Sequence, residues 1–157
     1  MLRPELYHKT VDILVQAYFN DTLESWNCSA CAVGNLVAAN MGYELKKPAN
    51  GGLRWYNQVG ELIHSSWSLV HSLSSFGQEI RPMNYGGKAK AEIDSTGYSY
   101  TETASIELAF ENGYEVGEAD DERMFNGLMA VIEVLDQIHE NTDTDVTTAS
   151  KQKFQRA

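Results

Sequence analysis

The stretch NCSACAVGNLVAANMG, residues 27–42, decides the fold. Its apolar residues recur at helical spacing: Cys31, Val33, Leu36, Val37 and Ala39. Asn27 or Ser29 can cap a helix here, because a short polar side chain accepts a hydrogen bond from the first free N–H groups. Gly42 can take the left-handed conformation that ends a helix. The sequence therefore predicts a helix that starts at the C-x-x-C motif and ends at Gly42.

Working outward, the sequence predicts further helices over 4–20, 55–73, 99–113 and 120–138, where apolar residues also recur at helical spacing. Pro4 suits the first turn of a helix. Ser99 and Glu102 have the spacing of a capping box, in which each side chain binds the backbone of the other residue. The acidic run that starts at Asp120 favours a helix N-terminus electrostatically. Gly60 weakens the segment 55–73, where a break would be tolerated.

Two segments lack helical periodicity. Residues 76–97 contain many turn formers and are expected to form one long irregular connection, although 88–93 would suit a short helix or a strand. Residues 141–157 are polar and are expected to be disordered, because they offer too little apolar surface to offset the entropy of ordering. The predicted fold class is all-α: a compact bundle of four to five helices in one domain, residues 1–140, followed by the tail.

The chain has 157 residues and a formal net charge of −10, which repels phosphate backbones, so direct nucleic-acid binding is not expected. No apolar run reaches the length of a transmembrane helix, and the N-terminus is too polar for a signal peptide. The sequence thus predicts a cytoplasmic protein with no membrane partner. Motifs of common hydrolases, ATPases and dehydrogenases are absent, which disfavours an enzyme.

Cys28 and Cys31 are the strongest candidates for metal binding or thiol chemistry. At a helix N-terminus a thiol can have a lowered pKa, because the helix dipole stabilises the thiolate that binds metals and acts as nucleophile. With His64 as a further ligand, the pair would form a metal site for zinc or iron, although the spacing matches no zinc finger. A thiol-redox role is a second interpretation. The third is structural, because free cysteines are often small buried apolar residues.

A second candidate site lies beside a glycine-rich loop. Arg54, Trp55, Tyr56 and Asn57 follow Gly51 and Gly52, and the two aromatic rings could form a stacking surface for a ligand or a partner side chain. The alternative is that the rings pack in the core.

Three blocks of sequence carry a resemblance to a known set of proteins: 17–23 (AYFNDTL), 28–35 (CSACAVGN) and positions within 97–110, of which the C-A-V-G-N core is the most specific. They resemble short uncharacterised proteins from Bacteroidetes-type bacteria and their phages. Such proteins often carry the name of a subunit of the sodium-translocating NADH-quinone reductase. That subunit is much larger, and it holds flavin and an iron–sulfur cluster in domains absent here. Similar proteins often have another cysteine where this sequence has Asn27. The resemblance implies a recurring helical module, carried by phages, that modulates a host component.

The leading hypothesis is therefore a non-enzymatic, acidic binding or accessory protein that engages a protein partner or a small ligand, in the host cytoplasm if a phage encodes it. One form of it is mimicry of nucleic acid toward a basic groove, which high salt would disrupt. The alternatives are a C-x-x-C metal or thiol-redox protein, and a phage structural or cargo component. A homo-oligomer is left open.

Overall fold

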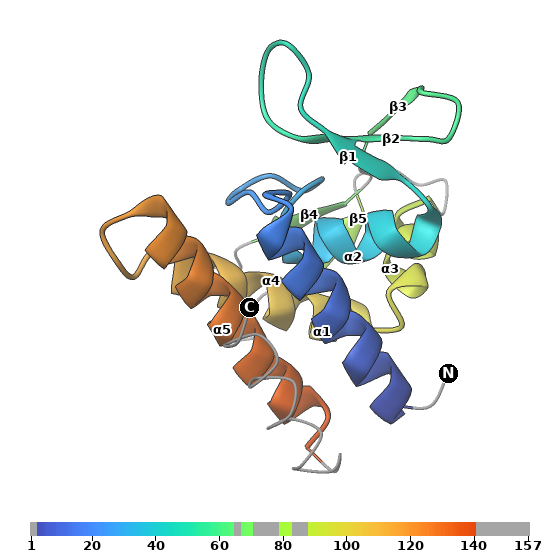
Figure 1. Ribbon diagram of the computed structural model, residues 1–157. Coiled ribbons are helices and arrows are strands. Elements are labelled where there is room, and N and C mark those ends of the chain that lie inside the picture. Colours follow the sequence, from blue (N-terminus) through green and yellow to red (C-terminus); the bar gives the residue numbers. More distant parts are fainter. Residues whose placement is uncertain (1–2, 65–66, 71–78, 83–87, 141–157) are drawn as a thin grey trace.

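Helix α2, Ala32–Met41, lies at the centre of the molecule, where it contacts helices α1, α3 and α4 (Figure 1). Every residue from Ala32 to Ala38 is buried, which is the pattern of a helix that its neighbours cover on all sides. Gly42, with a φ of 76°, takes the left-handed conformation and ends the helix as predicted.

The computed structural model describes residues 3–64, 67–70, 79–82 and 88–140, with side chains over 4–64 and 90–140. Helices make up most of this part of the chain, so the predicted helical bundle is confirmed, with a small β component added to it. The elements other than α2 are α1 (Arg3–Phe19), β1 (Glu44–Lys46), β2 (Arg54–Tyr56), β3 (Leu62–Ile63), β4 (Trp67–Val70), β5 (Glu79–Pro82), α3 (Lys88–Ser95), α4 (Tyr100–Tyr114) and α5 (Asp120–Ile138).

The long helices form where the sequence predicts them, because each buries an apolar stripe against the others. In α1 and α5 these stripes are fully covered: Tyr7, Val11 and Leu14, and Leu128, Val131, Ile132 and Leu135. The capping box of α4 is confirmed, since Ser99 and Glu102 exchange hydrogen bonds of 3.0 Å between each side chain and the other residue's N–H. Helices α4 and α5 pack together as a hairpin. No described helix is long and apolar enough to cross a membrane.

The predicted helix over 55–73 is wrong. Its described residues form strands β2, β3 and β4, and β2 is the middle strand of an antiparallel sheet with β1 and β3. The side chain of Asn57 accepts hydrogen bonds from the backbone N–H groups two and four residues later, and Gly60 has a φ of 85°, so the chain reverses here. Trp55 is buried while Arg54 is exposed, which is the alternation of a strand.

The prediction of one irregular connection over 76–97 is also wrong in its described parts. Residues Glu79–Pro82 are strand β5, which pairs antiparallel with β4, and Lys88–Ser95 are helix α3. The helical option for 88–93 is thus confirmed. Residues 71–78 and 83–87, like the predicted tail 141–157, lie outside the described residues.

A chain of buried polar groups joins α1 to the ends of α4 and α5. The hydroxyl of Tyr98 lies 3.0 Å from Thr10 Oγ1 and 2.8 Å from His139 Nε2. Nearby, the Tyr7 hydroxyl donates to Asp136 Oδ1 at 2.9 Å. Because buried polar groups are costly unless they are paired, these contacts fix how the three helices sit on one another.

Candidate functional site

The turn that carries the C-x-x-C motif is held in place by Gly34 and Asn35, the last two residues of the C-A-V-G-N core. Asn35 Nδ2 donates to the carbonyl oxygens of Thr22, Ala30 and Cys31, at 2.7, 2.9 and 3.1 Å. Gly34 leaves no room for a side chain, because a Cβ there would lie 2.5 Å from the carbonyl oxygen of Cys28. The C-A-V-G-N core therefore has a structural role: it clamps the preceding turn against the start of α2.

The cap of α2 is Cys31, which corrects the prediction that Asn27 or Ser29 caps this helix. The Cys31 sulfur accepts a hydrogen bond from the Gly34 N–H at 3.2 Å, and the residue is completely buried. Asn27 instead shapes the turn, because its carbonyl oxygen accepts from the N–H of Cys31 at 2.7 Å. The two cysteines do lie at the N-terminal end of the helix, as predicted.

Glu107 of α4 reaches this turn from a distant part of the sequence. Its buried carboxyl group lies against the Cys31 thiol and the Ala32 N–H, which both favour its charged form, while its Oε1 has no hydrogen-bond partner. Burial raises the pKa of Glu107 to about 8, and the negative charge of Glu111 adds to this effect. Glu107 is therefore mostly protonated at neutral pH.

The pKa of Cys31 is the opposite of what its place at a helix N-terminus predicts. Burial raises this pKa well above the ordinary value, and the charge of Glu107 raises it further. The hydrogen bond from Gly34 acts in the other direction but is outweighed. Desolvation thus dominates over the helix dipole, and Cys31 is a thiol rather than a thiolate at rest.

One turn further along α4, Glu111 holds the next part of the same loop. Its carboxylate oxygens accept from the Ser25 hydroxyl at 2.6 Å and from the Trp26 N–H at 2.9 Å. Trp26 has a φ of 57°, which is rare and strained for a bulky residue, and 65% of its surface is exposed. The Glu111 carboxylate therefore anchors a strained turn that presents an indole to solvent.

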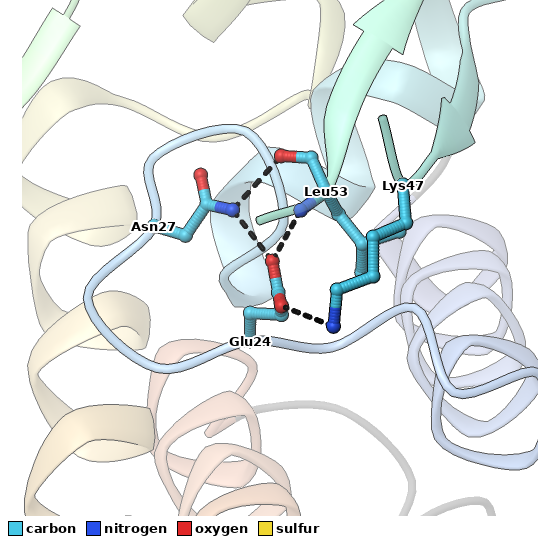
Figure 2. A network of polar contacts seen from close by, with 4 residues as sticks. All are labelled: Glu24, Asn27, Lys47 and Leu53. Carbon is cyan, nitrogen blue, oxygen red and sulfur yellow. Dashed lines mark hydrogen bonds and ion pairs between the residues drawn. The ribbon is translucent and has the colours of Figure 1, made fainter. Parts of the chain in front are cut away.

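Glu24 ties the loop to the start of β2, as Figure 2 shows. One carboxylate oxygen accepts from Asn27 Nδ2 at 2.8 Å and from the Leu53 N–H at 2.5 Å, and the other lies 3.9 Å from Lys47 Nζ. Asn27 Nδ2 also donates to the Leu53 carbonyl oxygen at 2.9 Å. Loop 23–28 is thus fastened to α4 on one side and to the sheet on the other.

A polar cleft of about 660 Å³ lies between loop 23–28, the start of β2, and the junction of α4 with α5. We name it the Trp26 cleft. It brings together an exposed indole, a thiol, a guanidinium, a phenol and a carboxylate: Trp26, Cys28, Arg54, Tyr114 and Asp120. Behind Tyr114, the guanidinium of Arg123 stacks on the ring at 4.3 Å from its centroid. The cleft has the volume of a site for a drug-sized ligand or a few peptide side chains.

The structure separates the residues that the sequence singled out. Cys28, half-buried, and Arg54, exposed, both line the Trp26 cleft. Trp55 is completely buried and packs against Tyr43, with its indole N–H donating to the Ser29 carbonyl oxygen at 2.5 Å, so it belongs to the core.

Besides the buried Cys31 and Trp55, three more predicted site residues lie outside the Trp26 cleft. Tyr56 is half-buried in β2, Asn57 shapes the turn between β2 and β3, and His64 is exposed. Within the described part of the chain, no three side chains of His, Cys, Asp or Glu are placed to hold a metal ion, so Cys28, Cys31 and His64 are not gathered into such a site.

Sequence reasoning missed Trp26, Glu107 and Glu111. A signal existed for the two glutamates, because they lie four residues apart in line with the apolar positions Ile106 and Phe110 of a predicted helix. Charges in an apolar stripe are unusual and often mark a functional site. Trp26 gave no signal, since its strained backbone depends on Glu111, 85 residues away.

A larger groove of about 880 Å³ runs between α1, α2 and β1. Its floor is largely apolar and includes Ile13, Ala17, Ala38 and Leu45, and charged residues such as Glu5, Lys9 and Asp12 line it as well. It contains none of the predicted site residues. No family model matches the chain, and no curated protein and no solved structure matches it either.

Proposed function

We propose that the chain is a non-enzymatic binding protein that engages a basic segment of a protein partner through the Trp26 cleft. The observation that carries this proposal is the exposed indole of Trp26 on a strained turn that Glu111 holds in place. Backbone strain persists only where the surroundings enforce it, and it concentrates at functional sites. Exposed tryptophans on preorganised loops are among the commonest hot spots of protein interfaces.

The charge of the molecule indicates what kind of segment would bind. The net charge is −10, and Asp120, which lines the cleft, belongs to the acidic first turn of α5 with Asp121 and Glu122. Such a surface attracts a positively charged partner and speeds its association at low salt. An arginine or lysine of the partner would stack on the Trp26 indole by a cation–π interaction. Arg54 would donate hydrogen bonds to a carboxylate or a carbonyl group of the same segment.

An array of short synthetic peptides tests the proposal. Arginine-rich peptides are compared with the same sequences in which glutamate replaces arginine, and binding of the purified protein is measured at low and at high salt. We expect binding to some of the basic peptides, none to the charge-reversed ones, and weakening by salt. Binding to neither class, or binding that salt leaves unchanged, would contradict the proposal.

The variant for this experiment is Trp26→Gly, since glycine adopts a positive φ freely. It should raise the free energy of unfolding by about 1 kcal/mol through relief of strain. It should also weaken peptide binding by roughly 30-fold, the effect of losing a hot-spot residue. Phe19→Ala is the matched control, because Phe19 is also a half-exposed aromatic residue but does not line the cleft. Equal losses in both variants would place the binding surface elsewhere.

A further inference from the structure

Cys28 and Cys31 lie close enough to form a disulfide, and the proposed binding function makes no use of this. Cys28 and Cys31 lie three residues apart in one tight turn, and the Cys31 sulfur is 3.8 Å from the Cys28 carbonyl oxygen. Turn residues at this spacing have Cα atoms within about 7 Å of each other, the range in which a disulfide can close. In the structure both residues are thiols that no disulfide joins.

The two thiols differ in their access to solvent. Cys28 is half-buried and lines the Trp26 cleft, whereas Cys31 is completely buried behind it. A molecule in the cleft therefore meets the first cysteine and not the second. This is the asymmetry that distinguishes an attacking thiol from a resolving thiol in disulfide exchange.

Beside the two thiols lies a third chemical group, the carboxyl group of Glu107, which is in contact with the buried thiol of Cys31. A carboxyl group buried with one oxygen unpaired costs stability, and Glu107 is such a group. The carboxyl group lies against the thiol of Cys31, where it is placed to take up the proton of that thiol. Its pKa of about 8 is near neutral pH, which is the range in which a carboxylate both takes up and releases a proton readily.

We propose that Cys28 and Cys31 form a thiol–disulfide exchange site that opens into the Trp26 cleft, with Cys28 as the attacking thiol, Cys31 as the resolving thiol and Glu107 as the proton acceptor. The substrate class is a small disulfide or an exposed disulfide of a protein. This site does not depend on the binding function proposed above, because it needs no partner segment.

The exchange takes place in two steps. Cys28 gives its proton to the solvent, and its thiolate attacks one sulfur of the substrate disulfide. This forms a mixed disulfide and releases the other half as a thiolate, which takes up a proton from the solvent. In the molecules in which Glu107 is ionised, its carboxylate then takes the proton of Cys31, and the Cys31 thiolate attacks the Cys28 sulfur. The second half of the substrate leaves as a thiolate and is protonated in turn. The protein loses two hydrogen atoms, and one disulfide becomes two thiols.

The test uses the full chain and oxidised glutathione, with intact-mass spectrometry over time. The wild-type protein should lose the mass of two hydrogen atoms as the Cys28–Cys31 disulfide closes. Cys31→Ser should accumulate one glutathione adduct on Cys28. Cys28→Ser should remain unmodified while folded and react only in denaturant, because Cys31 is buried. Equal reactivity of the two single variants, or a wild-type adduct that never closes, would overturn the proposal.

Glu107→Gln separates the role of the base from a purely structural one. This variant should form the Cys28 adduct at the wild-type rate, and the closure step should be slower by roughly 100-fold, as expected for loss of a general base. Glu133→Gln, an exposed change on α5, is the control and should leave both steps unchanged. Closure at the wild-type rate in Glu107→Gln would remove Glu107 from the mechanism.

Discussion

At the scale of single residues, the buried carboxyl group of Glu107 couples α4 to the C-x-x-C turn. A group whose pKa is higher in the folded state than in the unfolded chain binds its proton more tightly when folded. The pKa of Glu107 rises from its ordinary value of 4.5 to about 8 when the chain folds. Its contribution to stability is therefore fully present at low pH and is lost as the pH rises from about 4.5 to about 8.

This behaviour predicts how Glu107→Gln compares with the wild type. Glutamine does not titrate, so the free energy of unfolding of the variant should rise relative to wild type by roughly 3 kcal/mol between pH 5 and pH 7.5. Urea denaturation in reducing buffer across this pH range measures the difference. Glu133→Gln, which is exposed, should give a curve parallel to wild type. Parallel curves for Glu107→Gln as well would show that the carboxyl group is not buried as described.

At the scale of secondary-structure elements, the close contact between α2 and the cysteine turn depends on Gly34. Alanine normally favours a helix by about 1 kcal/mol over glycine, yet here its Cβ would lie 2.5 Å from backbone atoms of Cys28 and Ser29. We expect Gly34→Ala to lower the free energy of unfolding by roughly 2 to 3 kcal/mol, because backbone cannot move aside cheaply. Thermal or urea unfolding measures this.

Gly60→Ala is the control for that prediction. Nothing lies within 4 Å of a Cβ at Gly60, so this variant meets only the cost of a positive φ, about 1 kcal/mol. A Gly34→Ala variant as stable as wild type would mean that the turn does not pack against α2 as closely as the structure has it.

The elements also show which parts of the fold the sequence can predict. Helices α1, α2, α4 and α5 have local signals, namely caps, an end at Gly42 and an apolar stripe. The segment 55–73 has apolar residues that fit either a helix or strands, and the choice depends on pairing with β1 and on the turn at Asn57. That pairing is a tertiary effect, which local periodicity does not contain.

The same distinction holds for the candidate site. Cys28 and Arg54 stand out by residue type and neighbouring motif, and the structure places both in the Trp26 cleft. Trp26 and Glu111 acquire their roles only through contacts between residues 85 or 86 positions apart. A single sequence shows such residues but not the fact that they meet.

At the scale of the whole molecule, the two hollows discussed above, both lined by described residues, differ in their chemistry. The Trp26 cleft is polar and is built from three distant segments, whereas the groove between α1, α2 and β1 has a largely apolar floor. We assign recognition of the partner to the Trp26 cleft. The acidic charge of the chain and the strained, exposed Trp26 both favour that cleft for a basic segment.

Backbone amide chemical shifts of ¹⁵N-labelled protein, followed while an arginine-rich peptide is added, locate the binding surface directly. We predict that the shifts that change most belong to residues 23–28, 52–54 and 114–124, and that Trp26→Gly makes these changes much smaller at the same peptide concentration. Changes confined to residues 5–17 and 38–45, which line the larger groove, would contradict the account.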